Sequence, residues 1–318
     1  MSKAVQFRPD ILLIHNRMAK KNTYVSYIFF ILIAIGLLWI TVRSRREHFS
    51  QQIPKKIWTY WDDEEIKNKT VQLCIQSWKK YNPDYEVIVI HQKNLKDYID
   101  LDVKSMKMND GPARESDIIR LNILQKYGGV WVDASILMTA PLDFTTEEYE
   151  FYGYKIDAFI SKKGIPVIES WFFATVPGGK FITAWRDEFM KANNFSRVED
   201  ALESLKKQGV QYDKISNTVY LFIHICAQKI LQKEMSADEI KKTFSLQTAE
   251  ETALKYLNLN GWDSGKALAS LCKGENVMPL IKFRSGERKY LEDHPELREC
   301  IFKLDSRTLT MSLGQISY

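Results

Sequence analysis

Two acids and an arginine stand out among the apolar residues of one short segment of the sequence. Asp117, Arg120 and Asp133 are surrounded by Ile, Leu and Val in SDIIRLNILQKYGGVWVDASIL, residues 116–137. A charged side chain that is buried without a partner is costly. The pattern therefore predicts that these groups lie at an edge of the core or bind something.

Asp117 and Arg120 are spaced to share one helical face. On a helix that starts near Ala113 they are i, i+3 neighbours at the N-terminal end of a stripe that faces the core. The alternative to a binding role is an ion pair within the helix, which contributes little. Gly128 and Gly129 then end the helix and allow a tight turn.

Asp133 and Ser135 are spaced to project from one side of a strand. Side chains alternate along VWVDASIL, residues 130–137, so these two point the same way near its C-terminal end. Ligand crevices of open α/β sheets lie outside the C-terminal ends of strands. An acid and a hydroxyl there can reach one hard cation or one ribose. The alternative is an Asp that begins a turn, although the apolar run continues through Leu137.

The elements that must position these residues alternate between strand and helix. IPKKIWTYW, residues 53–61, reads as a strand, and Lys69–Tyr81 has helical apolar spacing. YEVIVI, residues 85–90, reads as a strand covered on both faces. Strand, helix and strand continue through residue 138. This alternation predicts an α/β domain of three layers with a mostly parallel central sheet over residues 53–318.

An uncharged segment precedes this domain. Tyr24–Val42 contains no charged residue and would span about 28 Å as a helix. It predicts one transmembrane helix at 23–42, between an N-terminal tail (1–22) and a juxtamembrane spacer (43–52). A buried core helix is the alternative. Basic residues flank both sides, so the positive-inside rule leaves the orientation open. We expect a single-pass membrane protein with the membrane as a partner.

Composition excludes several classes of protein. The net charge of +5 is modest, and no basic stripe with interleaved aromatics is present, so we expect no nucleic-acid partner. The chain has no GxSxG, HExxH or P-loop motif. The cysteines have no metal-binding spacing, and in a domain of this size buried free thiols are expected rather than a disulfide framework; they are Cys74, Cys226, Cys272 and Cys300.

RESDIIRLNILQKYGGVWVDAS, residues 114–135, resembles the nucleotide-sugar motif of the capsular polysaccharide synthesis family. That family is similar to the DXD sugar-binding glycosyltransferases, which include α-mannosyltransferases and the large clostridial glucosylating toxins. The resemblance covers residues 53–230, and the sequence beyond residue 240 matches poorly. Further landmarks are IPKKIWTYW (53–61), SWKKYNPDYEV (77–87), PLDF (141–144) and ESWFFATVPGGKF (169–181).

The resemblance implies a GT-A-type nucleotide-sugar-binding domain and roles for particular residues. Trp58 would stack on the nucleotide base, and Asp117 and Arg120 would bind the hydroxyls of the donor sugar. Asp133 would take the first acidic position of the DXD motif, toward ribose and a divalent cation, Mn²⁺ or Mg²⁺. Ser135 takes the second position, where many relatives have Asp. A hydroxyl is a weaker ligand for a hard cation than a carboxylate.

Other polar residues have two interpretations each. A basic group near the C-terminus could close over phosphates or form a solvated loop; its members are Lys282, Arg284, Arg288 and Lys289. Glu169 could position an acceptor hydroxyl or lie on the surface. His224, in an apolar helix, is expected to be a core histidine.

These observations predict a membrane-anchored glycosyltransferase with Asp117, Arg120 and Asp133 as catalytic residues. The resemblance implies that it would move a sugar from a nucleotide-diphosphate donor to a glycan or polysaccharide acceptor, with retention of configuration by analogy with related families. The alternative is a non-catalytic glycan-binding or scaffold protein that keeps the fold, and Ser135 is the feature that keeps this alternative open.

Overall fold

The order of helices and strands follows the alternation expected from the sequence. The computed structural model describes residues 31–36, 52–143 and 149–304, and the statements about structure below refer to these residues. Residues from Gln52 onward form one unit. Its strands are β1 (Lys56–Tyr60), β2 (Glu86–Ile90), β3 (Gly129–Val132), β4 (Ile136–Met138), β5 (Phe151–Lys155), β6 (Ile168–Thr175), β7 (Phe244–Thr248) and β8 (Leu280–Lys282). Its helices include α2 (Lys69–Tyr81), α3 (Leu95–Tyr98), α4 (Pro112–Tyr127), α5 (Lys180–Met190), α6 (Val198–Lys207), α7 (Phe222–Lys233), α8 (Ala237–Thr243), α9 (Lys255–Asn258), α10 (Ser264–Cys272), α11 (Ser285–Asp293) and α12 (Pro295–Ile301).

A six-stranded sheet lies at the centre of this unit, in the order β2-β1-β3-β6-β5-β7. β1 runs parallel to both β2 and β3, and β5 runs parallel to β7. β6 is antiparallel to its neighbours β3 and β5 and runs against the other described strands of the sheet. The prediction of an α/β domain with a mostly parallel central sheet is confirmed.

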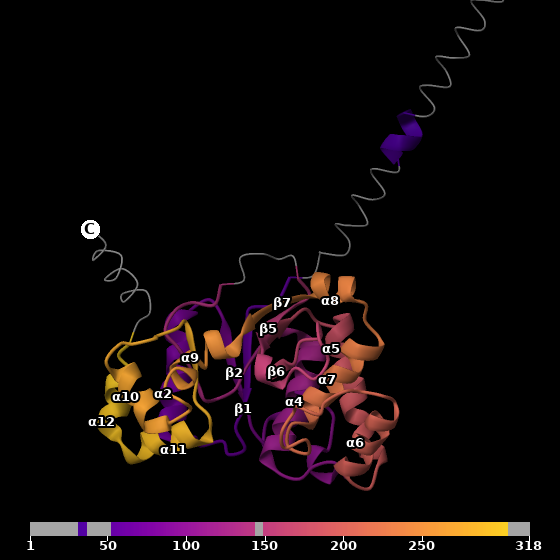
Figure 1. Ribbon diagram of the computed structural model, residues 1–318. Coiled ribbons are helices and arrows are strands. Elements are labelled where there is room, and N and C mark those ends of the chain that lie inside the picture. The colour runs from indigo at the N-terminus through magenta and orange to yellow at the C-terminus, as the bar shows by residue number, and fades with distance from the viewer. Residues whose placement is uncertain (1–30, 37–51, 144–148, 305–318) are drawn as a thin grey trace, which may run out of the picture. The chain divides into compact units, whose positions relative to one another are not determined.

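Helices cover both faces of the sheet (Figure 1). On one face, Ile118 and Leu121 of α4 pack with Trp131 and with residues of α5, α6 and α7 in one core. On the other face, Val130 and Val132 pack with residues of α2, α9, α10 and α11 in a second core. Successive residues of β3 thus enter opposite cores, as strand geometry requires. The result is the expected architecture of three layers.

A second, two-stranded sheet replaces part of one predicted strand. The sequence predicts a continuous strand over 130–137, but β3 ends at Val132 and the chain turns at Asp133. The amide of Ile136 closes this turn by donating to the carbonyl of Asp133 at 3.0 Å. β4 then pairs antiparallel with β8, which brings Ile136 opposite Lys282. The prediction of one strand is wrong because the chain leaves the large sheet to pair with β8.

The turn between α4 and β3 requires glycine at both positions. Gly128 and Gly129 have φ angles of +61° and +95°, which other residues rarely adopt. A Cβ atom on Gly129 would lie 2.7 Å from the carbonyl oxygen of Lys56 in β1. The indole of Trp58 fixes the turn by donating from Nε1 to the carbonyl of Gly128 at 2.9 Å. This close approach sets the position of α4 relative to β3.

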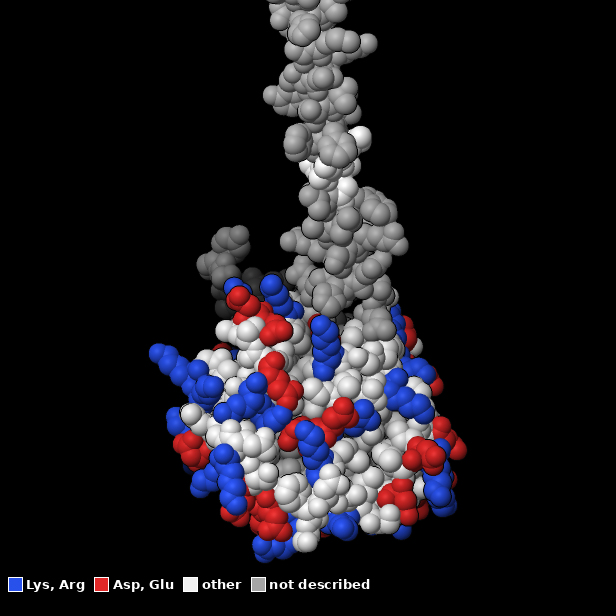
Figure 2. Space-filling view, turned by 90° about the vertical axis from the view of Figure 1, so that its right-hand side faces the viewer, with Lys and Arg blue, Asp and Glu red and all other residues white. Residues whose placement is uncertain are grey.

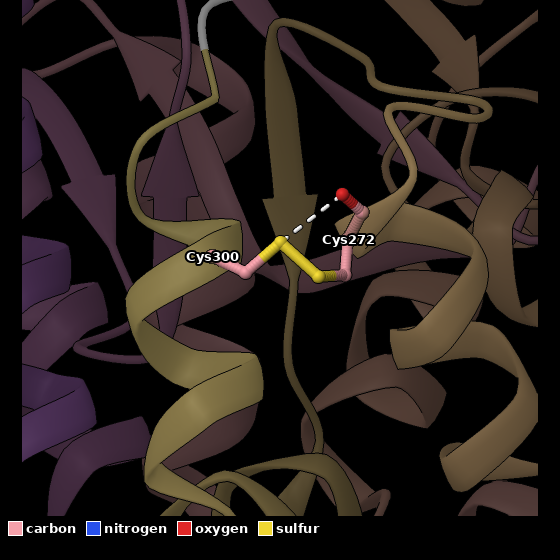
Figure 3. The surroundings of a disulfide bond; sticks show 2 residues. All are labelled: Cys272 and Cys300. Carbon is pink, nitrogen blue, oxygen red and sulfur yellow. Dashed lines mark hydrogen bonds between the residues drawn. A yellow bond between two sulfur atoms is a disulfide. The ribbon is translucent and has the colours of Figure 1, made fainter.

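A disulfide joins two helices near the C-terminus (Figure 3). Cys272, at the end of α10, is bonded to Cys300 in α12. Cys74 and Cys226 are free and buried. The expectation of buried free thiols is therefore confirmed for two cysteines and wrong for the other two. The packing of α10 on α12, which brings the pair together, cannot be read from cysteine spacing alone.

The N-terminal segment contributes little to the described structure. Residues 31–36 are helical, and the rest of the predicted span at 23–42 lies outside the described residues, as do the tail at 1–22 and most of the spacer at 43–52. Within the described ranges, no helix combines the length and apolar character needed to cross a bilayer.

The outer surface over α6 and α7 carries charges of both signs. Figure 2 shows lysine and arginine side chains interspersed with aspartate and glutamate on this face. Mixed charge of this kind is typical of a solvated protein surface.

Candidate functional site

The three charged residues singled out in the sequence meet at the C-terminal end of β3. Asp117 and Arg120 lie one turn apart on α4, and Arg120 Nη2 is 3.4 Å from Asp117 Oδ1. The same Nη2 atom lies 3.3 Å from Oδ1 of Asp133, which follows β3. The ion pair within the helix therefore exists, but it is buried and extends to a third residue. The Gly-Gly turn that ends α4 makes this convergence possible.

Lys282, the last residue of β8, is the fourth charged residue of this group. Its Nζ donates to Asp133 Oδ2 at 2.7 Å and to Ser135 Oγ at 3.1 Å. Asp133 Oδ1 also accepts from the indole Nε1 of Trp131 at 3.0 Å. Asp133 thus has a cation at each carboxylate oxygen. We refer to Asp117, Arg120, Asp133 and Lys282 as the charge cluster.

Arg120 is held in place by contacts that leave its orientation little freedom. Its Nε and Nη2 donate to the carbonyl and the hydroxyl of Ser116, at 3.3 and 2.9 Å. Its Nη1 donates to the carbonyl of Ser170 in β6. The guanidinium also lies 5.1 Å from the ring of Trp131, a distance suited to a cation–π contact. Arg120 therefore joins α4, β3 and β6 at one point.

Asp117 differs from Asp133 in its surroundings. Its side chain is 10% exposed and faces Arg120 at 3.4 Å and Arg114 Nη1 at 3.7 Å. The carboxylate accepts no side-chain or backbone hydrogen bond from the described residues. Burial raises the pKa of Asp117 above its ordinary value, and the two arginines oppose this shift without cancelling it. Asp117 is thus a buried carboxylate whose oxygens can still accept hydrogen bonds from a ligand.

The pKa values of Asp133 and Lys282 follow from their contact. Burial raises the pKa of Asp133, but Lys282 and Arg120 outweigh it and hold that pKa below its usual value. Burial lowers the pKa of Lys282, while the contact with Asp133 opposes that shift and the charges of Arg288 and Arg120 add to it. Asp133 is therefore an ionised carboxylate at neutral pH.

Two residues near the cluster, Arg114 and Tyr220, were not assigned to the site from the sequence. Arg114 is buried on α4, donates to the carbonyl of Val219, and lies 3.5 Å from Asp110. Tyr220 is 59% exposed, and burial together with the charges of Asp117 and Asp133 raises its pKa. The spacing of Arg114 three residues before Asp117 is a signal that the sequence offered. Tyr220 offered none, since it follows a loop with no motif.

Arg288, on α11, belongs to the basic group that the sequence analysis considered for phosphate binding. Its charge lowers the pKa of Lys282. Within the described part of the chain its side chain forms no hydrogen bond or ion pair. The basic residues at 282–289 therefore do not form a solvated loop. Lys282 ends β8, whereas Arg288 and Lys289 lie on α11. Arg284 instead pairs with Glu287 at 2.9 Å, and Lys289 is exposed.

Trp58 does not lie where the resemblance implied. It is 1% exposed, stacked on Tyr127 at 5.4 Å and edge-on to Tyr98 at 5.5 Å. The expectation that it stacks on a nucleotide base is not supported, because its ring is covered by these neighbours and by the core. Its place in this structure is the anchor of the turn at Gly128.

Glu169 and His224 form a buried pair beside the cluster. His224 Nε2 lies 3.2 Å from Glu169 Oε2, and both side chains are at most 10% exposed. The interpretation of His224 as a core histidine is confirmed, but it is not fully satisfied, because its buried Nδ1 has no hydrogen-bond partner among the described residues. The alternative that Glu169 lies on the surface is wrong, because β6 is buried along its whole length. Glu169 directly precedes Ser170, whose carbonyl accepts a hydrogen bond from Arg120, so the pair adjoins the site.

The residues around Ser135 fit a divalent cation poorly. Hard cations such as Mg²⁺ and Mn²⁺ require several oxygen ligands. Here the candidate ligands are one carboxylate, Asp133, and one hydroxyl, Ser135, and Lys282 contacts both. In the described ranges, no three acidic, histidine or cysteine side chains gather as a metal site. A bound cation would have to displace the ammonium group and remain close to Arg120.

Comparison with known sequences identifies relatives over most of the unit. The sequence profile described as "Capsular polysaccharide synthesis protein" matches residues 37–273. The chain is 26% identical over 159 residues to "O-glycosyltransferase braB" of Annulohypoxylon truncatum, covering 43% of this chain and 37% of the relative. It is 31% identical over 218 residues to "Subversion of eukaryotic traffic protein A" of Legionella pneumophila, covering 51% of this chain and 33% of that protein. The chain thus spans about a third of the length of these curated relatives.

Solved structures give weaker matches. A glycosyltransferase involved in glycosylation of the major capsid of PBCV-1 aligns with a TM-score of 0.41 at 9% identity, over 76% of this chain and 98% of that one. The UDP-bound glycosyltransferase domain from the YGT toxin aligns with a TM-score of 0.40 at 11% identity, over 81% and 99%. The sequence profile covers well over half of the chain and includes the whole RESD–VDAS segment. The chain belongs to the capsular polysaccharide synthesis protein family.

Proposed function

We propose that this protein is a glycosyltransferase that moves a sugar from a nucleoside diphosphate to a glycan or polysaccharide acceptor. The observation that carries the proposal is the convergence of Asp117, Arg120, Asp133 and Lys282 where β3 ends. Membership of the family supports it. A buried carboxylate, Asp117, and a partly exposed one, Asp133, in contact with two cations suit a ligand that offers both hydroxyls and phosphates.

Each member of the charge cluster has a distinct role in this proposal. Asp117 accepts a hydrogen bond from a hydroxyl of the donor sugar, since its carboxylate forms ion pairs with two arginines but accepts no hydrogen bond from the described residues. Arg120 and Lys282 lie close to the diphosphate, and Asp133 holds both cations in place. A fixed array of charge of this kind stabilises a leaving group without rearranging during the reaction.

The transfer exchanges one carbon–oxygen bond for another. The bond between C1 of the sugar and the β-phosphate oxygen breaks, and its electron pair remains on the diphosphate. The acceptor hydroxyl oxygen bonds to C1 and its proton passes to the departing diphosphate. Attack from the face that the diphosphate leaves gives retention of configuration. The fold in this proposal is of the GT-A type.

We further propose that the chain is anchored in a membrane by residues 23–42, with the folded unit in an oxidising space. The uncharged segment supports the anchor. The disulfide between Cys272 and Cys300 supports the oxidising space, because disulfides persist outside the reducing cytosol. Protease protection of intact vesicles tests both points: the folded unit should resist digestion until the membrane is dissolved.

Hydrolysis and transfer assays with a panel of nucleotide sugars test the enzymatic proposal. Purified protein should release a nucleoside diphosphate from at least one UDP- or GDP-linked sugar. Asp117→Asn should slow that release while the protein remains folded. Binding of glycans without turnover of any donor would instead support a glycan-binding or scaffold protein.

A further inference from the structure

Lys282 lies beside the turn at Asp133, and the residues next to it in the sequence do not predict this contact. It is the last residue of β8, where its amide donates to the carbonyl of Ala253 at 3.1 Å and its carbonyl accepts from the hydroxyl of Tyr256 at 2.9 Å. Its register partner is Ile136, and the amide of the next residue, Phe283, donates to the carbonyl of Ser135 at 3.0 Å. The backbone of Lys282 is therefore tied to the turn that carries Asp133 and Ser135.

One N–H group of the Lys282 ammonium has no acceptor among the described residues. A lysine ammonium carries three N–H donors. Asp133 Oδ2 and Ser135 Oγ accept from it at 2.7 and 3.1 Å, and no third acceptor lies within hydrogen-bond distance among the described residues. The side chain is only 11% exposed and its Nζ lies 6.0 Å from the ring of Trp171. The charge is thus held in one place, with capacity for one more anionic contact.

A divalent cation and Lys282 would compete for the same two oxygens. Asp133 Oδ2 and Ser135 Oγ are the atoms that a metal ion would use at this turn, and both already bind the ammonium group. Asp133 Oδ1 is in contact with Arg120 at 3.3 Å and accepts from Trp131 at 3.0 Å. A hydroxyl in place of a second carboxylate weakens the site for a metal but suits a hydrogen bond from lysine.

We propose that Lys282 supplies from the protein itself the positive charge that a divalent cation would otherwise supply, so that this chain binds a nucleoside diphosphate without metal. The inference rests on the proposed function, because it assigns the diphosphate to the charge cluster. Ser135 is then a partner of Lys282 rather than a degenerate metal ligand. Arg288, the cation nearby on α11, adds to the positive field.

Calorimetric binding of UDP and GDP to the full-length protein tests this inference. Wild-type protein should bind at least one of them with a Kd in EDTA that lies within about threefold of its Kd in Mn²⁺. Lys282→Met should raise that Kd about 10- to 150-fold in EDTA, as expected for loss of a hydrogen bond from a charged group. Asp133 keeps Arg120 and Trp131 in this variant, so the fold should persist. Lys289→Met, which removes an exposed lysine of α11, is the matched control and should bind as wild type does.

A second variant exchanges one source of charge for the other. Ser135→Asp combined with Lys282→Ala places two carboxylates at the turn and removes the ammonium group. This double variant should bind Mn²⁺ directly, as measured by electron paramagnetic resonance, and should bind the nucleotide only when Mn²⁺ is present.

The outcomes separate the inference from the proposed function. Wild-type binding that appears only with Mn²⁺ would overturn the role of Lys282 and leave the glycosyltransferase proposal intact. Unchanged affinity in a folded Lys282→Met protein would overturn it as well. Failure of the panel of donors and of both nucleotides, with and without Mn²⁺, would instead remove the proposed function and this inference with it.

Discussion

Replacement of Asp117 by Asn separates a functional carboxylate from a structural one. Burial raises the pKa of Asp117, so the ionised form at neutral pH is less favourable in the folded chain than in the unfolded chain. The two arginines that face it have other partners: Arg114 lies 3.5 Å from Asp110, and Arg120 lies 3.3 Å from Asp133. Asp117→Asn should therefore keep or raise the melting temperature at pH 7.

The effect on activity should be opposite. A hydrogen bond to a charged group contributes about 1.5–3 kcal/mol, and a neutral amide acceptor recovers about 0.5–1.5 kcal/mol of it. The net loss of about 1–2 kcal/mol lowers the rate of sugar transfer about 5- to 30-fold. Asp110→Asn is the matched control, because Asp110 contacts the same arginine but is 55% exposed. An exposed pair contributes about 0–1 kcal/mol, so that variant should remain close to wild type.

The pH dependence of stability provides a further check on Asp117. A raised pKa stabilises the fold fully below the unfolded value, near 3.8, and that contribution is lost as pH rises through the folded value. The melting temperature of Asp117→Asn relative to wild type should therefore increase between pH 4 and pH 7. A variant that is less stable than wild type at pH 7, with activity lost in proportion, would show that Asp117 is a structural ion pair.

Three further predictions concern the framework around the site. Trp58→Phe should lower the free energy of unfolding by about 1–3 kcal/mol, since the buried carbonyl of Gly128 loses its donor, while the affinity for UDP or GDP stays the same; weaker nucleotide binding in the folded variant would restore a base-stacking role. Gly129→Ala should cost more than about 2 kcal/mol in denaturant unfolding, because its φ of +95° and a backbone oxygen 2.7 Å away disfavour any side chain; a stability like that of wild type would contradict the turn geometry. Reduction of Cys272–Cys300, which closes a loop of 28 residues, should cost about 3–4 kcal/mol of stability, and a reductant should have no effect on Cys300→Ser.

The sequence predicted the elements better than it predicted their connections. Lys69–Tyr81 is helical at the expected residues, because its apolar spacing and the cap of Asn68 act locally. The strand after Gly129 was predicted to be too long, because pairing of β4 with β8 depends on a segment more than 140 residues away. Periodicity reports the burial of a segment but does not identify its strand partner.

The sequence likewise predicted some contacts of the candidate site and missed others. Asp117 and Arg120 share a helical face, and their contact could be predicted from spacing alone. The contact of Arg120 with Asp133 followed from the helix, turn and strand, which are consecutive in the chain. Lys282 could be recognised as basic but not as a partner of Asp133, since nothing local places β8 beside that turn. Trp58 was assigned to a nucleotide base by the resemblance, but an aromatic residue in a strand can equally belong to the core, where Trp58 lies.

A crystal structure of the protein with a bound nucleotide sugar, or its nucleoside diphosphate, tests the central claim most directly. We predict diphosphate oxygens within hydrogen-bond distance of Lys282 Nζ, and a sugar hydroxyl that donates to the carboxylate of Asp117. A nucleotide bound elsewhere on the unit, with the four side chains of the charge cluster still in contact only with one another, would contradict the claim.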